Sequence, residues 1–365
     1  MKIALGIFKY FSFGGLQGDM RNIALELARR GNTVTIYTGA WESAETLPGI
    51  QVECLKLSGW SNHARALDFA RKFHQAAGDA DVKVAFNRFG GCDFYFAGDD
   101  CYAAFLKQKK GSAFLRYFGR YRIFARLEKE IFSPDASTRI FYISPRQKED
   151  YQAFYHTPEE RFIALPPGVG ENFTVPDPAL KQKQRQLIGA REDRKHVLFM
   201  AANWKLKGGD RLLEAFARLP EECRSQMQLH FVGGDGKGEA QSCAARLNVA
   251  EYCCFHGVQK NILPFVQAAD VLIHPARKEA AGNVIVEALS CGVPVICSGL
   301  CGFSSFVSTS GAGLVLPEPF SLENLIAAWQ KYLDGQPHFA KTAQAAAAVL
   351  PLKGRAQKAA DIICR

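Results

Sequence analysis

Residues 271–297 read Val271-Leu-Ile-His-Pro-Ala-Arg-Lys-Glu-Ala-Ala-Gly-Asn-Val-Ile-Val-Glu-Ala-Leu-Ser-Cys-Gly-Val-Pro-Val-Ile-Cys297. The apolar runs 271–274 and 293–297 predict two buried strands, and the stretch between them predicts a loop and then a helix from Asn283 to Cys291, which Gly292 ends. This order makes one βαβ crossover unit. Such units bind ligands beyond the carboxyl ends of their strands.

Two acids flank the start of this predicted helix. Glu279 lies in the ligand-facing loop, and Glu287 lies about one turn into the helix. A carboxylate can accept two hydroxyl protons at once, so it suits the vicinal diols of sugars and of ribose. The alternative is that Glu287 only caps or solvates a helix end, because acids are common in first turns. The residues alone leave both interpretations open.

Alternation of strands and helices occurs twice along the chain. The first half has predicted strands at 3–8, 33–37, 82–86 and 140–143. Its first helix has a single apolar face made of Leu16, Met20, Ile23, Ala24, Leu27 and Ala28. The second half has predicted strands at 197–201, 229–232, 271–274 and 293–297. This pattern predicts an α/β fold with two Rossmann-like doubly wound domains.

The passage 165–178 is polar and rich in proline, which makes it the best linker candidate. We therefore predict a first domain over residues 1–166 and a second over 175–343. Residues 344–365 are rich in alanine and lysine and are predicted to be helical.

The composition is that of a globular protein, with 48% hydrophobic and 22% charged residues among 365. The chain has no run of 18 apolar residues, and its first residues have no long apolar core, so we expect neither a spanning helix nor a signal peptide. The net charge of +9 favours an anionic partner, which could be a nucleic acid, a membrane or a phosphorylated acceptor.

Eleven cysteines are scattered singly or as Cys253-Cys254, without a Cys-x-x-Cys pair or a histidine at metal-binding spacing. We therefore expect buried, reduced thiols in the cytoplasm and no structural metal.

Glu279-x7-Glu287, followed by Ala-Leu-Ser-Cys-Gly-Val-Pro-Val295, resembles the signature of the retaining nucleotide-sugar glycosyltransferases of the GT-B architecture, glycosyltransferase family 4. Further motifs resemble, within that family, the lipopolysaccharide core glucosyltransferases I of Gram-negative bacteria. They are Lys9-Tyr-Phe-Ser-Phe-Gly-Gly-Leu-Gln17, Phe86-Asn87, Tyr95-Phe-Ala-Gly-Asp99, Arg120-Tyr-Arg122, Leu165-Pro-Pro-Gly168 and Glu279-Ala-Ala-Gly282. The similarity covers nearly the whole chain in order.

The resemblance implies two domains that face an interdomain cleft, with residues 344–365 crossing back onto the first domain. It implies transfer of glucose from UDP-glucose to a heptose of the lipopolysaccharide inner core, with retention of configuration. It also implies that no metal or other cofactor takes part. It further implies that the acceptor hydroxyl attacks on the same face that the diphosphate leaves, and that the departing phosphate oxygen takes its proton. No side chain in the sequence is a convincing covalent nucleophile.

A phosphate site is predicted at Asn203-Trp-Lys-Leu-Lys-Gly-Gly-Asp-Arg211, which follows a strand and opens a helix, so that its amides and Lys205 or Lys207 can reach an anion. The alternative is a solvated basic turn. The resemblance favours Lys207 as the phosphate lysine. Leu206 is a departure, because a relative within this family has arginine at that position. Gly14 and Gly15 would let the backbone of the first domain approach the same diphosphate.

The resemblance also assigns the remaining site residues. Glu287 would bind the ribose hydroxyls and Glu279 the transferred sugar, helped by the amides of Ala281 and Gly282. Asp99 matches the position that contacts the sugar or the acceptor from the first domain, although Asp100 beside it makes this assignment ambiguous.

Asp19 could orient an acceptor hydroxyl, or it could simply be an exposed acid near a helix start. Gly18 departs from the family, because the relative has arginine there. Asp19, Asp99, Lys207 and Glu279 are our candidate catalytic residues.

The loop Gly233-Gly-Asp-Gly-Lys-Gly238 resembles a dinucleotide fingerprint. The helix and the acid about 20 residues on that such a site needs do not follow in the right setting. We interpret it as the loop after a strand, so a nicotinamide dehydrogenase is disfavoured.

Residues 103–127 contain seven basic residues and no acid: Lys107, Lys109, Lys110, Arg116, Arg120, Arg122 and Arg126. Taken as one helix, the segment places Phe114, Tyr117, Phe118, Tyr121, Phe124 and Ala125 on one face. A basic, aromatic amphipathic helix fits an anionic membrane surface. The alternative is an ordinary helix packed on the core. Nucleic acid is disfavoured, because no binding motif for it accompanies these residues.

The sequence therefore predicts a peripheral glycosyltransferase on the cytoplasmic face of the inner membrane, with a UDP-sugar donor and a lipopolysaccharide core acceptor as partners. Another UDP-sugar or acceptor, a nucleotide-sugar epimerase of the same architecture, and a non-enzymatic basic binding protein are the alternatives.

Overall fold

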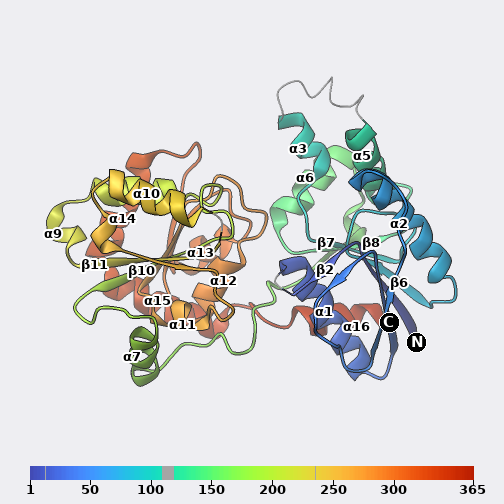
Figure 1. Cartoon of the computed structure of the whole chain (residues 1–365), viewed down its shortest axis with the longest axis horizontal. Helices are drawn as coiled ribbons and strands as arrows, with labels where there is room; N and C mark the ends of the chain where they lie inside the picture. The colour runs from blue at the N-terminus through green and yellow to red at the C-terminus, as the bar shows by residue number, and fades with distance from the viewer. Residues whose placement is uncertain (13, 109–118, 235) are drawn as a thin grey trace. The chain divides into compact units, whose positions relative to one another are not determined.

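The computed structural model describes residues 1–12, 14–108, 119–234 and 236–365, which divide into two compact units (Figure 1). Unit 1 contains residues 1–168 together with 354–365, and unit 2 contains residues 169–353. The passage after Gly168 thus belongs to unit 2 rather than to a free linker. The chain returns to unit 1 at Gly354, later than the predicted residue 344.

Unit 1 is built on a parallel sheet of seven described strands in the order β5-β3-β1-β6-β7-β8-β9. The strands are β1 (Lys2–Ile7), β3 (Thr33–Thr38), β5 (Ile50–Cys54), β6 (Val82–Ala85), β7 (Phe94–Ala97), β8 (Arg139–Tyr142) and β9 (Phe162–Ala164). Two short strands, β2 (Tyr10–Phe11) and β4 (Trp41–Glu42), pair separately. The strand order reverses between β1 and β6, which is where ligands bind in such sheets.

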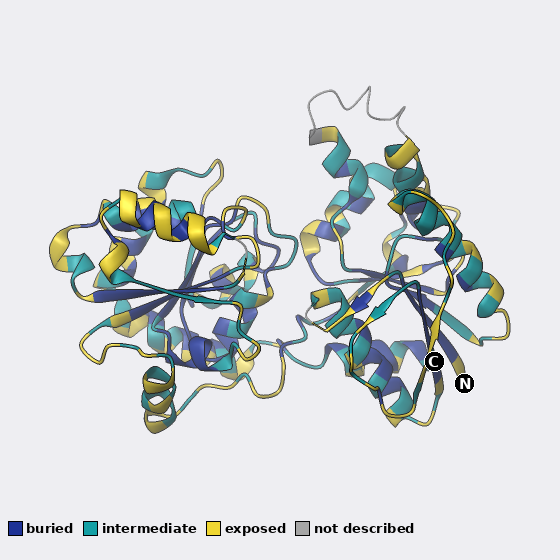
Figure 2. Cartoon of the chain, in the orientation of Figure 1, coloured by how far each residue is buried: buried dark blue, intermediate teal, exposed yellow. Residues whose placement is uncertain are grey.

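The helices of unit 1 surround this sheet. They are α1 (Gly15–Arg29), α2 (Asn62–Ala76), α3 (Tyr102–Gln108), α5 (Gly119–Phe132), α6 (Pro145–Tyr155), the short η1 (Glu159–Arg161) and α16 (Arg355–Ile363). In α1 the predicted face is confirmed, since Met20, Ile23 and Leu27 are fully buried. Figure 2 shows the central strands of this sheet as largely buried, whereas the edge strands β5 and β9 have no buried residue.

Unit 2 repeats the design with six described parallel strands in the order β12-β11-β10-β13-β14-β15. The strands are β10 (Lys195–Met200), β11 (Met227–Val232), β12 (Cys253–Gly257), β13 (Val271–His274), β14 (Val295–Ser298) and β15 (Gly313–Leu316). The order reverses between β10 and β13. The loops that follow these two strands therefore meet at one point of the carboxyl edge.

The helices of unit 2 cover both faces of its sheet. They are α7 (Pro178–Leu187), α8 (Gly209–Ala217), α9 (Glu221–Arg224), α10 (Lys237–Arg246), η2 (Ala250–Tyr252), α11 (Leu263–Ala268), α12 (Asn283–Ser290), α13 (Ser304–Ser310), α14 (Leu322–Asp334) and α15 (Gln336–Val349). The loop 233–236 leads into α10, so a helix does follow the glycine-rich loop. The prediction of two parallel, Rossmann-like α/β domains is confirmed.

The prediction of one continuous helix over 103–127 is wrong. The described residues place α3 and α5 side by side, with the ring centroids of Tyr102 and Phe124 only 5.8 Å apart. A straight helix would separate these two residues by about 30 Å at 1.5 Å per residue. Among the described residues, none of the helices combines the length and the apolarity needed to span a bilayer.

A buried ion pair attaches α16 to unit 1. Arg355 Nη1 donates to both carboxylate oxygens of Asp19 at 2.6 Å, and its Nε donates to the carbonyl oxygen of Pro166 at 2.8 Å. The Arg355 side chain is 4% exposed and that of Asp19 14%. Asp19 is therefore not the exposed helix acid that we considered. Both of its oxygens are engaged in holding α16 on α1.

We expect Asp19→Asn to lower the free energy of unfolding by about 3 kcal/mol, because it leaves a buried guanidinium without its counter-charge. Urea unfolding followed by circular dichroism measures this change. Asp361→Asn is the matched control, since Asp361 joins the same two helices through Arg30 at 2.7 Å but is 54% exposed. The control should cost less than about 1 kcal/mol. Equal costs for the two substitutions would contradict a tethering role for Asp19.

Candidate functional site

Lys207, His274 and Glu279 converge at the carboxyl edge of the unit 2 sheet. Lys207 Nζ lies 2.7 Å from Glu279 Oε2, and His274 Nε2 lies 3.2 Å from the same oxygen. Burial opposes ionisation of Glu279, but the hydrogen bond with His274 and the charge of Lys207 outweigh it, so the pKa of Glu279 is lowered. The site thus holds a carboxylate and a lysine cation in direct contact.

This contact exists because the two loops lie close together. Gly208 has a φ of 83°, and a Cβ on it would lie 2.1 Å from the carbonyl oxygen of Pro275. Only glycine fits such a left-handed, crowded position. The loops are joined further by the Arg277 amide, which donates to Leu206 O at 2.9 Å, and by Lys207 Nζ, which donates to Lys278 O at 3.0 Å. The Lys-Gly pair of the sequence therefore sets where the lysine points.

The start of α12 supplies backbone donors beside Glu279. Gly282 is the N-cap residue at a φ of 93°, and a Cβ there would lie 3.2 Å from Glu279 Cγ. The first amides of a helix have no partner within the helix, and the helix dipole favours negative charge there. Ala281 and Gly282 precede this turn, as the predicted donor site requires.

Glu287 lies on the second turn of α12, and its environment is unusual for an acid. Its Oε2 is shut off from solvent and has no hydrogen-bond partner among the residues that the structure describes, although the side chain as a whole is partly exposed. Burial raises the pKa of Glu287 to about 7. It neither caps the helix nor lies in open solvent. An unpartnered acid of raised pKa is typical of functional sites.

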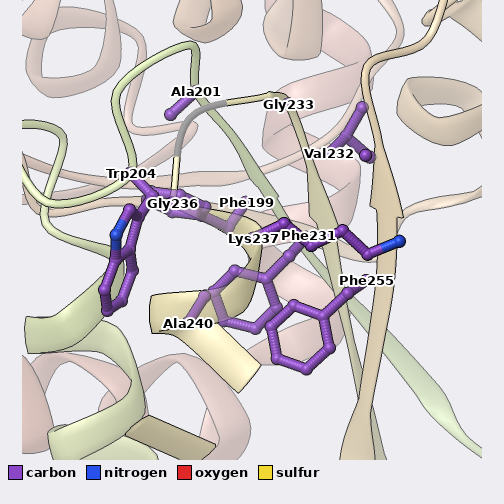
Figure 3. Close-up of a pocket in the computed structure, with 11 residues that line it drawn as sticks. Phe199, Ala201, Trp204, Phe231, Val232, Gly233, Gly236, Lys237, Ala240 and Phe255 are labelled. Carbon is purple, nitrogen blue, oxygen red and sulfur yellow. The ribbon is translucent and has the colours of Figure 1, made fainter. Parts of the chain in front are cut away.

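A small pocket lies at the carboxyl ends of β10, β11 and β12 (Figure 3). Aromatic side chains dominate its wall, and Lys237 and the glycines of the 233–236 loop complete it. Its volume of about 20 Å³ is enough for a water molecule and too small for a nucleotide base.

Unit 1 contains a much larger pocket of about 510 Å³ at the carboxyl ends of β1, β3, β6 and β7. Its polar lining includes Lys9, Glu42, Arg65, Asn87 and Asp99, and its walls are phenylalanines. Volumes of 300–1,000 Å³ are usual for small-molecule sites. Residues from three of the sequence motifs that carried the family resemblance thus gather around one cavity.

Asp99 is positioned by residues that the sequence did not single out. Arg88 Nη1 lies 3.1 Å from Asp99 Oδ2, and Arg88 Nε lies 3.0 Å from the fully buried carboxylate of Glu128. Glu128 also accepts hydrogen bonds from the amides of Tyr102 and Ala103, at the start of α3, at 2.7 and 3.0 Å. Glu128 therefore fixes both Arg88 and α3 around the cavity.

The sequence offered no signal for Glu128, because an acid in an amphipathic helix ordinarily faces solvent. His274 could have been found as the last residue of a predicted strand that faces the ligand edge.

The other predicted donor residues fall in less enclosed positions. Gly14 is the N-cap of α1 and Gly15 its first residue. Lys205 is exposed, and in the part of the chain that the structure describes its ammonium makes no ion pair. Leu206 is 41% exposed, and Gly18 has open space where a side chain would begin.

In the described ranges, three or more His, Cys, Asp or Glu side chains come close enough to hold a metal only at His230, Cys254 and His256. Asp99 and Asp100 form no such group.

We expect Glu287→Gln to stabilise the protein, and increasingly so as the pH rises. The folded carboxyl has a pKa of about 7 against an ordinary 4.5, so the unfolded chain releases the proton first. Stability that is present below about pH 4.5 is therefore lost as the pH rises through about 7. The variant should gain up to about 3 kcal/mol by pH 8 at ~1.4 kcal/mol per pKa unit, as measured by urea unfolding across this range. Glu214→Gln, on the exposed face of α8, should show no such trend. If the difference in unfolding free energy between Glu287→Gln and the wild type did not change with pH, the raised pKa of Glu287 would be contradicted.

Comparisons with known proteins agree with this geometry. Residues 181–349 match the family model described as "Glycosyl transferases group 1". The chain is 35% identical over 370 residues to the lipopolysaccharide glucosyltransferase WaaG of Escherichia coli K12, covering all of this chain and 98% of that protein.

Solved structures give the same result. The crystal structure of WaaG, described as a glycosyltransferase involved in lipopolysaccharide biosynthesis, superposes with a TM-score of 0.90 at 34% identity over 99% of both chains. A sucrose-phosphate synthase from Thermosynechococcus elongatus shares the fold at 19% identity, with a TM-score of 0.78 over 99% of this chain and 98% of that one. The chain therefore belongs to the family of the lipopolysaccharide glucosyltransferase WaaG, and it is a glycosyltransferase of the GT-B fold.

Proposed function

We propose that the protein transfers glucose from UDP-glucose to a heptose of the lipopolysaccharide inner core, with retention of configuration and without a metal ion. The observation that carries this proposal is the similarity to a lipopolysaccharide glucosyltransferase over the full length of the chain. The Lys207–Glu279 contact and the unpartnered Glu287 supply the matching chemistry.

Lys207 is the group that would neutralise the diphosphate. Its ammonium lies 2.7 Å from Glu279 Oε2. When the diphosphate binds, it competes for the same ammonium, which then stabilises the negative charge that develops as the sugar–phosphate bond breaks. Glu279 is released to accept hydrogen bonds from the sugar hydroxyls. The amides at the starts of α8 and α12 add further donors at the same edge.

Glu287 would hold the ribose. Two vicinal hydroxyls can each donate to one carboxylate, and Oε2 has no competing donor among the described residues. Binding favours the ionised form. Because the pKa of the free carboxyl is about 7, donor affinity should increase as the pH rises through that value.

The acceptor would bind in the unit 1 pocket, where Asp99 and Asn87 can bond to hydroxyl groups. Lys9 and Arg65 line the same cavity and would meet the negative charge of a phosphorylated acceptor. The acceptor hydroxyl would attack on the face that the diphosphate leaves, and a departing phosphate oxygen would take its proton. No protein nucleophile is needed for this course. We do not propose a catalytic role for Asp19, because both of its oxygens accept hydrogen bonds from Arg355.

We expect substitutions of Glu287 and Glu279 to affect different parts of donor binding, the nucleotide and the sugar. Glu287→Gln should weaken both UDP and UDP-glucose by about 10-fold or more, because it removes a charged acceptor from the ribose. Glu279→Gln should reduce only the additional affinity that UDP-glucose has over UDP. The affinity for UDP itself should stay the same or increase, because the Lys207 ammonium no longer has to break an ion pair to bind the diphosphate. Isothermal titration with UDP and with UDP-glucose measures both, and Glu214→Gln is the control.

The transfer itself is tested with purified protein, UDP-glucose and a deacylated core that ends in heptose. Product with retained configuration should form equally with Mg²⁺ and with EDTA. A changed sugar nucleotide in the absence of acceptor would identify an epimerase instead. Two results would contradict the proposed donor site. One is a rate of product formation that Glu287→Gln does not change. The other is an equal loss of affinity for UDP and for UDP-glucose in both Glu287→Gln and Glu279→Gln.

We also propose that the protein binds the anionic cytoplasmic face of the inner membrane through α3 and α5. Lys107, Arg120, Arg122 and Arg126 are exposed on these helices. Lys109, Lys110 and Arg116, which were predicted to act with them, lie outside the described residues. Each basic side chain near an anionic surface adds about 1 kcal/mol of attraction.

Replacing Arg120 and Arg122 with alanine should therefore weaken binding to phosphatidylglycerol vesicles by about 30-fold, from ~2 kcal/mol. Vesicle sedimentation at low salt measures the effect, and phosphatidylcholine vesicles should bind neither protein. Lys260→Ala with Lys341→Ala removes the same charge from exposed sites of unit 2 and should change little. Equal losses in the two double variants would show that only net charge matters, and would contradict a dedicated surface.

A further inference from the structure

Three histidines and a cysteine share one face of the unit 2 sheet. In the parallel register His230 of β11 stands opposite Cys254 of β12 and opposite Leu198 of β10. Side chains two residues apart on a strand point to the same face, so His196 and His256 join His230 and Cys254 there. The sheet register therefore brings together residues that are up to 60 positions apart, from His196 to His256.

The ring nitrogens form a continuous chain. His196 Nδ1 lies 3.1 Å from His230 Nε2, and His230 Nδ1 lies 3.0 Å from His256 Nε2. One ligand atom each of His230, Cys254 and His256 lies within 4.8 Å of the other two. A tetrahedral zinc ion with bonds of 2.0–2.3 Å holds nitrogen and sulfur ligands about 3.3–3.7 Å apart. The ligand atoms of the cluster are at most 4.8 Å apart, about 1 Å beyond that range.

The surroundings supply what a metal site needs beyond its ligands. His196 bonds the second nitrogen of His230, which would fix the ring as a ligand. Gln228 Nε2 donates to Cys254 Sγ at 3.1 Å, and Gln228 Oε1 in turn accepts from the Arg191 amide at 2.9 Å.

An apolar wall is also present. The Phe265 ring of α11 packs edge-on against His256, with the two ring centroids 4.7 Å apart.

The cluster is costly without a ligand. His196 and His230 are 1% and 2% exposed, and His196 Nε2 has no partner among the residues described. Apolar side chains of similar volume would avoid this desolvation. The sugar and phosphate chemistry uses none of these residues.

We propose that His230, Cys254 and His256 bind a zinc-type divalent metal ion, which fastens the edge strand β12 to β11. The ligands are two imidazole nitrogens and one thiolate, a set that suits zinc and its substitute cobalt. The thiol proton of Cys254 is released to solvent on binding. The expectation of no structural metal rested on local spacing along the chain, which cannot show a set assembled across two strands.

The probe is Co²⁺ added to the whole protein, purified with EDTA and kept reduced with a phosphine. We expect one Co²⁺ per chain, a thiolate-to-cobalt charge-transfer band in the near ultraviolet and strong visible bands of a four-coordinate ion. Excess Zn²⁺ should remove all of them. Cys254→Ser should abolish the charge-transfer band, and His256→Gln should weaken Co²⁺ binding by at least about 10-fold.

Cys253→Ser is the matched control, because Cys253 is adjacent in sequence but its thiol donates to Val249 O on the other side of β12. Cys54→Ser controls for the exposed thiol. Both should keep the wild-type spectrum. Absence of the thiolate band in the wild-type protein, or its survival in Cys254→Ser, would overturn the proposal. The wild-type spectrum decides this even if a substitution disturbs folding, and transferase activity is not part of the readout.

Discussion

The contact between Lys207 and Glu279 is the interaction on which the candidate site depends. It joins the loops that follow β10 and β13, the two strands between which the order of the unit 2 sheet reverses. Parallel sheets leave a crevice at such a point, and the two loops fill it with one cation and one anion. Gly208 makes the approach possible, because no larger residue fits against Pro275. At this edge of the sheet the positive charge of Lys207 and the negative charge of Glu279 thus neutralise each other.

This neutralised state has a functional consequence under the proposed reaction. Glu279 holds the Lys207 ammonium in position before any diphosphate binds. Lys207 in turn helps to keep the largely buried Glu279 ionised. A diphosphate exchanges one partner for another and frees Glu279 for the sugar. Glu287 represents the opposite case, since nothing in the described structure balances its charge and burial raises its pKa to about 7. The protein tolerates that cost where a ligand would repay it.

Much of the fold could be predicted from the sequence, because apolar runs and amphipathic spacing report directly on buried strands and helices. The strands around 271–274 and 293–297, the helix α12 and the burial face of α1 all follow from such local patterns. The loop positions of Lys207 and Glu279 also follow, since a strand end fixes the edge at which a loop lies. Short edge strands without a buried residue, such as β5 and β9, gave no comparable signal.

What could not be predicted depends on contacts between distant residues. The sequence left open whether Asp19 orients an acceptor or is an exposed acid, because it cannot show that Arg355 lies beside it. Glu128 was not singled out, although it is fully buried. The aromatic segment 103–127 has helical periodicity, but the described parts of it fold against each other. In each case the outcome depends on which helices and strands pack together. The spacing of apolar residues along the chain does not determine that packing.

The central claim is that Glu279 and Glu287 contact opposite ends of one donor molecule. A crystal structure of the protein with UDP-glucose tests it most directly. We predict the ribose hydroxyls within hydrogen-bond distance of Glu287, the glucose hydroxyls at Glu279, and the diphosphate on Lys207. A donor bound with its ribose away from α12, or with Lys207 still paired to Glu279, would contradict the account.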